Sequence, residues 1–387
     1  MADLLQYFTG QQDAMVELLQ ALVSYETFTA SKPDVDKLGA VMEQHFRDLG
    51  ASSITRIPQD AVGDFLLAKW NEDAPGRPIM FLIHIDTVWP IGTLAQRPIR
   101  IEDGVFYGPG AIDMKGGITI VLSALRGLRE LGEFPNRPIW VLMTTDEEVG
   151  SVHSEPIIKE LAQQAGLVLV MEPATPEEAI KTSRKGVATF TIEVEGRPSH
   201  AGNAPEKGIN AIVELAHQII TLNQMNDLKN GTSVSVTMVS GGTATNVIPA
   251  QATAKVDVRT LTVMAYEDIT AKIMALEPVV PGAKITVTPG HARGPMERNA
   301  RMIADFEQLR AIGARIGLPP VEEASSGGGS DGNFTAMMGV STLDGLGPQG
   351  DGLHALHEHV VLSSLPRRSA LIAAVLRDWV FDENAPS

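Results

Sequence analysis

The segment from residue 77 to residue 86 reads "RPIMFLIHID" and carries an unbroken apolar run into a histidine and an aspartate. Such a run is typical of a strand that is buried on both faces of a parallel sheet. Two further runs have the same character, "RPIWVLMTTDEE" at 137–148 and "AGLVLVMEP" at 165–173. A helical pattern at 115–131 lies between the first run and the second. The alternation predicts an α/β domain with a mixed, largely parallel sheet.

The middle of the chain has a different pattern, in which apolar and polar residues alternate as in strands with one exposed face. Strands are predicted there at 187–196, 233–242, 251–260 and 283–290, and helices at 207–223 and 266–277. This βαββαβ order is that of a ferredoxin-like domain, with a four-stranded antiparallel sheet and two helices on one face. We therefore predict one α/β domain from residues 1–185 plus 295–387, interrupted by an inserted domain at 186–294.

The length, net charge and cysteine content of the chain exclude several classes of protein. A chain of 387 residues is long enough for two domains. The net charge of -16, with no dense Lys/Arg cluster, argues against nucleic-acid binding. There are no cysteines, so thiolate metal sites, a cysteine nucleophile and disulfides are excluded. The first residues form an acidic amphipathic pattern and no apolar run reaches membrane-spanning length, so we expect no membrane segment and a cytoplasmic protein.

Metal-competent side chains follow each of the three buried strands. The first strand ends in His84 and Asp86, the second in Asp146-Glu147-Glu148 and the third in Glu172. A glycine-rich loop, "YGPGAIDMKGG" at 107–117, places Asp113 just before the next helix. Taken one at a time, each has an ordinary structural interpretation: His84 as a structural histidine, Asp146-Glu147-Glu148 as a solvated acidic loop, and Asp113 as a helix N-cap. Because the carboxyl ends of such strands meet at one edge, we expect the side chains to converge.

If these carboxylates lie close together, cations must balance their negative charge, because like charges repel one another at short range. Histidine and carboxylate ligands suit zinc, cobalt or manganese. Two metal ions about 3.5–4 Å apart, bridged by a carboxylate, are a known hydrolytic arrangement. The sequence therefore favours a metal site at this edge of the sheet.

Five motifs together resemble a known family in order and spacing: "HIDTV" (84–88), "GPGAIDMKGG" (108–117), "TTDEEVGS" (144–151), "MEP" (171–173) and "GRPSHAG" (196–202). The chain is similar to the zinc peptidases that include bacterial glutamate carboxypeptidase, the aminoacylases, acetylornithine deacetylase and succinyl-diaminopimelate desuccinylase. "VIPAQATAKVDVR" and "SSGGGSDGNF" are most similar to the glutamate carboxypeptidase branch. The resemblance implies a catalytic di-zinc domain interrupted by a lid and dimerisation domain.

The resemblance also implies a ligand set, with Co²⁺ or Mn²⁺ as substitutes for the two Zn²⁺ ions per subunit. Asp113 would bridge both metals, and Asp86 would orient His84 from the same face of the strand. The metal ligands implied are His84, Asp113, Glu148, Glu172 and His354. Glu147 would be the general base. For the last ligand, "DGLHALHEHV" (351–360) also offers His357, but His354 has a glutamate four residues further on.

Residues of the inserted domain would complete the site. The resemblance assigns His200 to the oxyanion, often from the partner subunit of a homodimer. It assigns Arg259 to the free carboxylate of the substrate, for which a guanidinium is chemically suited. Asn246 and the backbone of Gly327-Gly328-Gly329 would also contact the substrate. A solvated sheet face is the alternative interpretation of Arg259.

The predicted reaction is hydrolysis of an amide bond by a zinc-bridged hydroxide, releasing a C-terminal amino acid, glutamate-like by preference, from a peptide or an N-acyl amino acid. The chain would then be a di-zinc metallo-carboxypeptidase, or amidohydrolase. An aminoacylase-type deacylase on the same site is one alternative. A non-catalytic binding protein on the same scaffold is another, although the chain retains all five ligands and the base.

Overall fold

The computed structural model describes residues 3–381, which form two compact units. The first unit combines residues up to 182 with 298–325 and those from 330 onward, and the second combines 183–297 with 326–329. The predicted limits of the inserted domain, 186 and 294, fall three residues inside those of the second unit. The short segment 326–329 was not predicted to join it.

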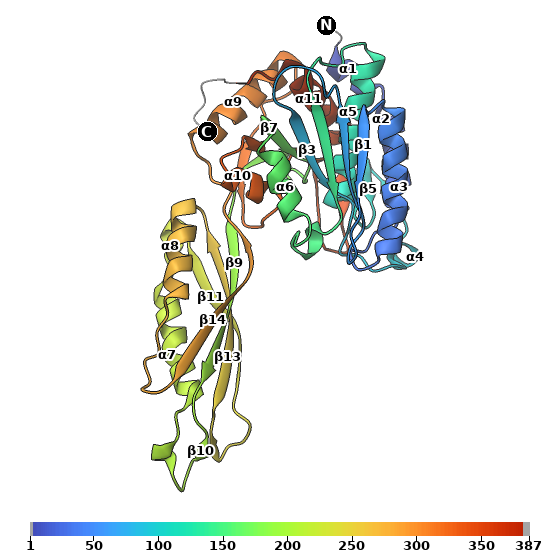
Figure 1. The fold of residues 1–387 in the computed structure, drawn as a ribbon. Helices are drawn as coiled ribbons and strands as arrows, with labels where there is room; N and C mark the ends of the chain where they lie inside the picture. The colour runs from blue at the N-terminus through green and yellow to red at the C-terminus, as the bar shows by residue number, and fades with distance from the viewer. Residues whose placement is uncertain (1–2, 382–387) are drawn as a thin grey trace. The chain divides into compact units, whose positions relative to one another are not determined.

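The first unit is built on a six-stranded sheet that contains the three predicted buried strands (Figure 1). The strand order is β1 (Ser53–Ile57), β2 (Phe65–Trp70), β6 (Ile139–Thr144), β3 (Ile79–His84), β7 (Leu167–Val170) and β16 (Thr342–Leu343). Parallel pairs join β6, β3, β7 and β16, whereas β2 pairs antiparallel with both β1 and β6. The sheet is therefore mixed and largely parallel, as predicted.

Strand β3 lies in the middle of this sheet, and all six of its residues are buried. Its Met80 and Leu82 pack in one cluster with residues of α6 (Glu155–Ala162) and α10 (Gly332–Met337). Helix α5 (Gly116–Glu130) packs closely against the segment that follows β7. The apolar run of β3 is thus explained by burial on both faces, and its end delivers His84 to the edge of the sheet.

The remaining elements of the first unit cover or extend this sheet. The helices are α1 (Leu4–Thr9), α2 (Gln12–Val23), α3 (Lys32–Asp48), α4 (Thr93–Gln96), α9 (Ala300–Arg315) and α11 (Ser364–Asp378). A small antiparallel sheet has the order β17 (Gly350–Asp351), β18 (His359–Val361), β5 (Val105–Tyr107) and β4 (Arg100–Glu102). Strand β8 (Ile180–Arg184) pairs with β15 (Glu323–Ser326), and the last residues of both strands belong to the second unit. The sheet of β17, β18, β5 and β4 is important for the site because it joins the two loops that carry Asp113 and His354.

The second unit has the predicted element order. Its elements are β9 (Gly186–Glu195), α7 (Ala211–Gln224), β11 (Ser233–Gly241), β13 (Gln251–Thr260), α8 (Val263–Met274) and β14 (Lys284–Arg293). The antiparallel strands lie in the order β11-β13-β9-β14, which is the ferredoxin-like arrangement. Alternate residues of β9 and β13 form a core with α7 and α8. A short ribbon, β10 (Ser199–His200) with β12 (Val247–Ile248), extends one end.

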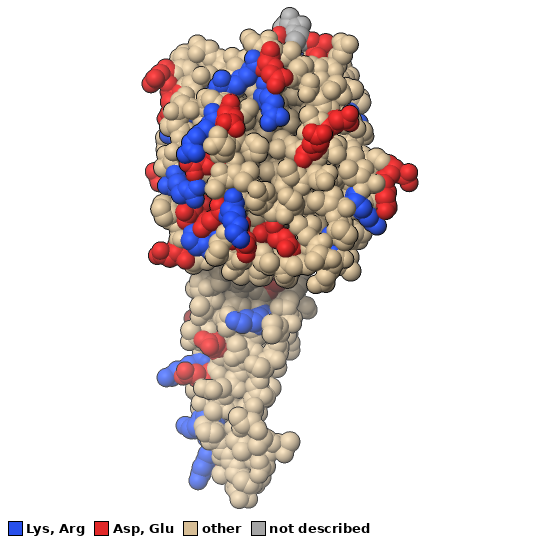
Figure 2. All heavy atoms as spheres, turned by 90° about the vertical axis from the view of Figure 1, so that its right-hand side faces the viewer, with Lys and Arg blue, Asp and Glu red and all other residues tan. Residues whose placement is uncertain are grey.

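Charged side chains of both signs are interspersed on the face of the first unit that Figure 2 shows. On α3, for example, Glu43 pairs with Arg47 and Arg56, and Lys32 lies 3.0 Å from Asp36. Within residues 3–381, every helix is too short or too polar to cross a membrane.

The close approach of α5 to the segment after β7 predicts the effect of two matched substitutions. A Cβ on Gly117 would lie 2.1 Å from the carbonyl oxygen of Met171, whereas a Cβ on Gly39 of α3 would lie 3.9 Å from the nearest atom, Cε of Met143. We expect Gly117→Ala to lower the free energy of unfolding by about 1–3 kcal/mol, because α5 must move. Gly39→Ala should raise it by up to ~1 kcal/mol. Urea unfolding of both variants tests this, and equal stability of the two would contradict it.

Candidate metal centre

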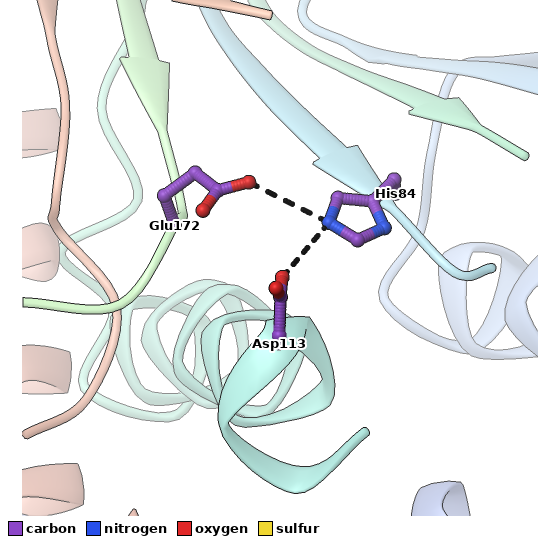
Figure 3. A group of neighbouring side chains, drawn as sticks. All are labelled: His84, Asp113 and Glu172. Atoms are coloured by element: carbon purple, nitrogen blue, oxygen red, sulfur yellow. Dashed lines mark hydrogen bonds and ion pairs between the residues drawn. The ribbon is translucent and has the colours of Figure 1, made fainter. Parts of the chain in front are cut away.

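His84 lies at the carboxyl end of β3 and contacts three carboxylate residues. Its Nδ1 lies 3.1 Å from the backbone oxygen of Asp86 and 3.4 Å from Oδ1 of the same residue. Its Nε2 lies 3.2 Å from Oδ1 of Asp113 and 3.5 Å from Oε1 of Glu172 (Figure 3). With the proton on Nδ1, where Asp86 accepts it, the lone pair of Nε2 would be available to a metal ion that His84, Asp113 and Glu172 could hold.

Asp113 lies between two histidines. It belongs to the turn Ala111–Lys115, directly before α5, and is buried. Its Oδ1 faces His84, while its Oδ2 lies 3.3 Å from Nε2 of His354. One carboxylate that presents its two oxygens to two sets of ligands has the geometry of a bridging ligand.

Glu148 and His354 complete a second group around Asp113. Glu148 lies in the short helix Glu147–Val149 that follows β6, and its Oε2 is 2.9 Å from Nε2 of His354. The donor atoms of Asp113, Glu148 and His354 all lie within 4.8 Å of one another, as do those of His84, Asp113 and Glu172. Each group can therefore hold one metal ion, and the two groups share Asp113.

The pKa values of this cluster show how strongly its charges interact. Hydrogen bonds to Asp113 and Glu148 raise the pKa of His354 to about 10, against its partial burial. Burial raises the pKa of Glu148 to about 7, although the hydrogen bond from His354 opposes this shift. Burial would lower the pKa of His84, but the neighbouring carboxylates, that of Asp113 first, raise it well above its usual range. Protonated histidines thus balance the buried carboxylates, and divalent cations can replace those protons, so the donor set fits a metal.

Asp86 has a second function besides its contact with His84. Its carboxylate is buried and accepts hydrogen bonds from the backbone N–H groups of Glu147 (3.3 Å) and Glu148 (3.2 Å) and from Oγ1 of Thr29 (2.9 Å). One aspartate therefore fixes the loop that carries both the predicted base and a predicted ligand.

Glu358 also belongs to the site, although the sequence analysis assigned it no role and used only its position, four residues after His354. It is fully buried, and its carboxylate accepts hydrogen bonds from the backbone N–H groups of Gly110 (2.8 Å) and Ile112 (3.1 Å) and from Nε1 of Trp89 (2.7 Å). The N–H of Asp113 lies 3.4 Å from the same carboxylate. Glu358 thus joins the loop of His354 to the turn of Asp113.

Arg97 holds the outer side of the same loop. Its guanidinium lies 4.3 Å from the ring centre of Trp89, and its Nη2 donates to the backbone oxygen of Leu356 at 2.8 Å.

His354 has a φ of +59°, which few residues other than glycine adopt. Among the described residues, His354 takes part in a metal-competent group, whereas His357 is exposed and in neither.

The other predicted site residues belong to the second unit, whereas both groups of metal-competent residues lie in the first. His200 pairs with Val247 in the β10–β12 ribbon, and Asn246 directly precedes β12, where its backbone oxygen accepts from the N–H of Ala201 at 2.9 Å. Arg259 donates two 2.9 Å hydrogen bonds to Asp257, so the structure pairs this guanidinium within its own strand. The carbonyl of Gly328 accepts from Arg184, and its N–H donates to Ser326.

Arg259 lies at one end of the four-stranded sheet, whereas His200 lies in the separate ribbon beyond its other end. Arg259 pairs with Val187 at the start of β9, whereas the β10–β12 ribbon continues beyond the pair of Gln251 with Glu195 at its end. Arg259 lies eight positions after Gln251 in β13, about 26 Å along the strand at the usual rise per residue. Figure 1 shows β10 at the tip of this unit. The two residues of one chain are therefore too far apart to contact one small molecule.

An edge of histidines and buried carboxylates, following parallel strands and able to hold two metal ions, defines a metal-dependent hydrolase. Comparison with known proteins agrees. Residues 80–378 match the model of peptidase family M20/M25/M40. The chain is 32% identical to carboxypeptidase G2 of Pseudomonas sp. (strain RS-16), over 97% of this chain and 91% of that protein. It is 28% identical to succinyl-diaminopimelate desuccinylase of Alkalilimnicola ehrlichii, over 94% of this chain and 98% of that protein.

The structural comparison supports the same fold. The crystal structure of aminopeptidase PepT from Bacillus cereus superposes with a TM-score of 0.76 at 23% identity, covering 95% of this chain and 98% of that one. The chain belongs to peptidase family M20/M25/M40, and it is a metal-dependent peptidase or amidohydrolase. The resemblance seen in the sequence motifs is confirmed, and the non-catalytic alternative loses its support.

The position of Glu358 generates a prediction about metal affinity. Glu358→Gln places an amide N–H₂ among backbone N–H groups and removes the charge that they stabilise, so the turn of Asp113 and the loop of His354 lose their common anchor. We expect metal affinity to fall about 10- to 100-fold, as for other residues that orient metal ligands. Competition with a chelator measures this. Glu102→Gln, an exposed carboxylate of β4, is the matched control. Unchanged affinity in Glu358→Gln would show that the loops hold their positions without it.

Proposed function

We propose that the protein is a di-zinc metallo-carboxypeptidase that releases a C-terminal amino acid, glutamate-like by preference, from a peptide or an N-acyl amino acid. The observation that carries the proposal is the pair of three-residue groups that share Asp113. The likeness to carboxypeptidase G2, 32% over 97% of the chain, favours a carboxypeptidase. The glutamate preference rests on the motif resemblance to the glutamate carboxypeptidase branch.

The metal ligands in this proposal are His84 and Glu172 on one side, Glu148 and His354 on the other, and Asp113 between them. When bound, two zinc ions, or cobalt or manganese in their place, would polarise the scissile carbonyl and acidify the attacking water. Asp86 holds His84 with Nε2 facing the centre, which keeps that nitrogen available as a ligand.

Glu147 is the proposed general base. It lies beside the ligand Glu148, and its backbone N–H is fixed by Asp86. In this role its carboxylate takes a proton from the attacking water and returns it to the leaving amine. A carboxylate next to, but outside, the two ligand groups is suited to this task because it keeps its lone pairs for the proton.

Residues of the second unit complete the proposed site. His200 would donate to the oxyanion, Asn246 and the backbone at Gly328 would contact the substrate, and Arg259 would bind its free carboxylate. The separation of Arg259 and His200 within one chain supports a homodimer through the second unit, in which the partner supplies His200. Asp257 would then share Arg259 with the substrate.

An N-acyl amino acid deacylase of the aminoacylase type, using the same site, is the second candidate. It is favoured by the 28% identity to succinyl-diaminopimelate desuccinylase over 94% of the chain. Both reactions cleave an amide beside a free carboxylate, so the residues named above serve either one. The cytoplasmic location expected from the sequence stays a prediction.

A panel of substrates separates the two candidates. We expect peptides and N-acyl derivatives with a C-terminal glutamate to be cleaved with the highest kcat/KM by the zinc-loaded protein, and chelation to abolish the activity. Amidation of the substrate carboxylate should raise KM in the wild type but have little effect in Arg259→Met. A preference for the acyl group over the C-terminal residue would favour the deacylase, and inactivity of the zinc-loaded protein towards the whole panel would refute both.

The role of Glu147 predicts a separation of metal binding from turnover. Glu147→Gln should retain the metal content of the wild type, because the residue lies in neither ligand group. Its kcat should fall by about 10²–10⁴-fold, the usual contribution of a general base. Metal analysis and turnover on the same preparation test both statements. Near wild-type turnover would refute the role, and loss of metal would make Glu147 a ligand.

The proposed exchange of His200 between subunits predicts complementation. His200→Ala and Glu147→Gln should each be nearly inactive alone. When the two variants are dissociated, mixed and allowed to reassociate, about half of the dimers should contain one subunit of each variant. Each of these mixed dimers would have one complete site out of two, so the activity should reach about a quarter of the wild type. No recovery in dimers proven to be mixed would place His200 in the site of its own chain, or outside the site altogether.

A further inference from the structure

The loop that carries Glu147 and Glu148 is closed by hydrogen bonds of its own residues. It begins after β6 with Asp146, which is buried. The carboxylate of Asp146 accepts hydrogen bonds from the backbone N–H groups of His153 (2.8 Å) and Ser154 (3.2 Å). These contacts give the loop its local shape, but they do not connect it to any distant segment of the chain.

Ser151, near the end of this loop, has a backbone conformation that favours glycine. Its φ is +57°, and the φ of the preceding Gly150 is +98°. Ser151 is fully buried, and its N–H donates to the backbone oxygen of Asp146 at 2.8 Å. A residue with a side chain persists in this conformation where its surroundings hold it, so the contacts of the serine hydroxyl are informative.

The hydroxyl of Ser151 donates a hydrogen bond to the carboxylate of Asp331, a residue 180 positions further along the chain. Asp331 is also buried, and both residues belong to the first unit. Hydrogen bonds to a carboxylate are stronger than those between neutral groups. This contact therefore ties the end of the loop to a distant segment of the same unit.

Asp331 makes this contact instead of capping its own helix. It directly precedes α10, a position at which an aspartate usually accepts N–H groups of the helix, but its side chain accepts none of them. Oγ of Ser330 accepts from the N–H of Gly332 at 3.1 Å, and Oδ1 of Asn333 accepts from the N–H of Ser330 at 2.9 Å. The start of α10 is thus held by its neighbours, and the Asp331 carboxylate serves the loop of Glu147.

The segment of Asp331 is in turn anchored to the edge of the sheet that carries the metal ligands. Asp344 directly follows β16 and is buried, and its Oδ2 accepts from Oγ of Ser330 at 2.5 Å. Strand β16 runs parallel to β7, which ends just before Glu172, so Asp344 and Glu172 emerge at the same edge. Asp331 therefore extends from a fixed support.

We propose that Asp331 is a positioning residue for the metal centre. Through Ser151 it holds the loop that presents Glu147 to the attacking water and Glu148 to the metal. Asp86 fixes the N–H groups at the start of this loop, and Asp331 fixes its end. Asp331 belongs to neither group of metal-competent residues, so it acts only through the loop. The proposal rests on the roles proposed above for Glu147 and Glu148.

Ser151→Gly separates positioning from stability, because glycine removes the hydroxyl and suits a φ of +57°. We expect kcat of the zinc-loaded protein to fall about 10- to 100-fold with little change in KM, because the base acts in the transition state. Asp103→Gly is the matched control, since Asp103 is exposed, has a φ of +50° and lies in the turn between β4 and β5. It should keep the kcat of the wild type. A merely structural Ser151 would change the free energy of unfolding but not kcat.

Substitutions of Asp331 test the other end of the hydrogen bond. Asp331→Ala should lower kcat as Ser151→Gly does, whereas Asp331→Asn keeps an acceptor oxygen and should recover most of the loss. The double variant Ser151→Gly, Asp331→Ala should be close to the worse single variant, because both changes remove the same contact. Losses that multiply in the double variant would overturn the proposal, as would wild-type kcat and wild-type zinc affinity in both single variants.

Two further measurements distinguish this proposal from the roles on which it rests. Asp331→Ala should lower kcat of the wild type but hardly that of Glu147→Gln, since the base is then already lost. An equal loss in both backgrounds would overturn positioning of the base. If Glu147→Gln itself keeps wild-type turnover, the proposed base is refuted, whereas weaker zinc binding by Ser151→Gly in competition with a chelator would still support the anchoring of Glu148 by Asp331.

Discussion

The position of Asp113 between two histidines is the constraint on which the rest of the site depends. His84 and His354 belong to segments far apart in the sequence, and each lies within 3.3 Å of one oxygen of this carboxylate. Glu148 and Glu172 lie on either side, so three carboxylates share a small, largely buried volume. Like charges at such distances repel one another strongly unless cations lie between them. The fold must therefore hold these groups in place against their own repulsion.

Two other carboxylates do this by accepting hydrogen bonds from the backbone. Asp86 fixes the loop after β6, and Glu358 fixes the turn of Asp113. Both are buried, and both are bound to N–H groups rather than to arginine or lysine. An N–H group orients a carboxylate without adding a full positive charge that would compete with a metal for the neighbouring ligands. The site thus gains rigidity and keeps its negative charge for a cation.

The sequence predicted the ligand edge because parallel strands bring their ends together. The register pairs His84 with Thr144 and Leu82 with Val170, so the residues that follow β6 and β7 emerge beside the end of β3. No such rule predicts Glu358. Its acceptor role depends on N–H groups 245–248 positions away in the chain, and nothing in "HALHEHV" indicates them. The left-handed φ of His354 is likewise not indicated by these residue types.

The parts of the fold that sequence reasoning missed are also those decided by long-range pairing. Strand β1 is half exposed and polar, so its alternation is weak, and only its antiparallel partner β2 makes it a strand. Segment 326–329 joins the second unit because Lys185 donates its N–H to Ser326 across the β8–β15 pair. A periodic pattern in one segment carries no information on such partners.

Incomplete compensation of charge distinguishes the metal centre from the paired charges elsewhere in the first unit. At the metal centre, carboxylates outnumber the cationic groups, and the histidines beside them retain protons that a metal can replace. Arg377 of α11, by contrast, has carboxylate partners in Glu133 and Asp378, as expected of a structural residue. A cluster of buried like charges with an incomplete set of partners therefore favours a bound ion of the complementary charge.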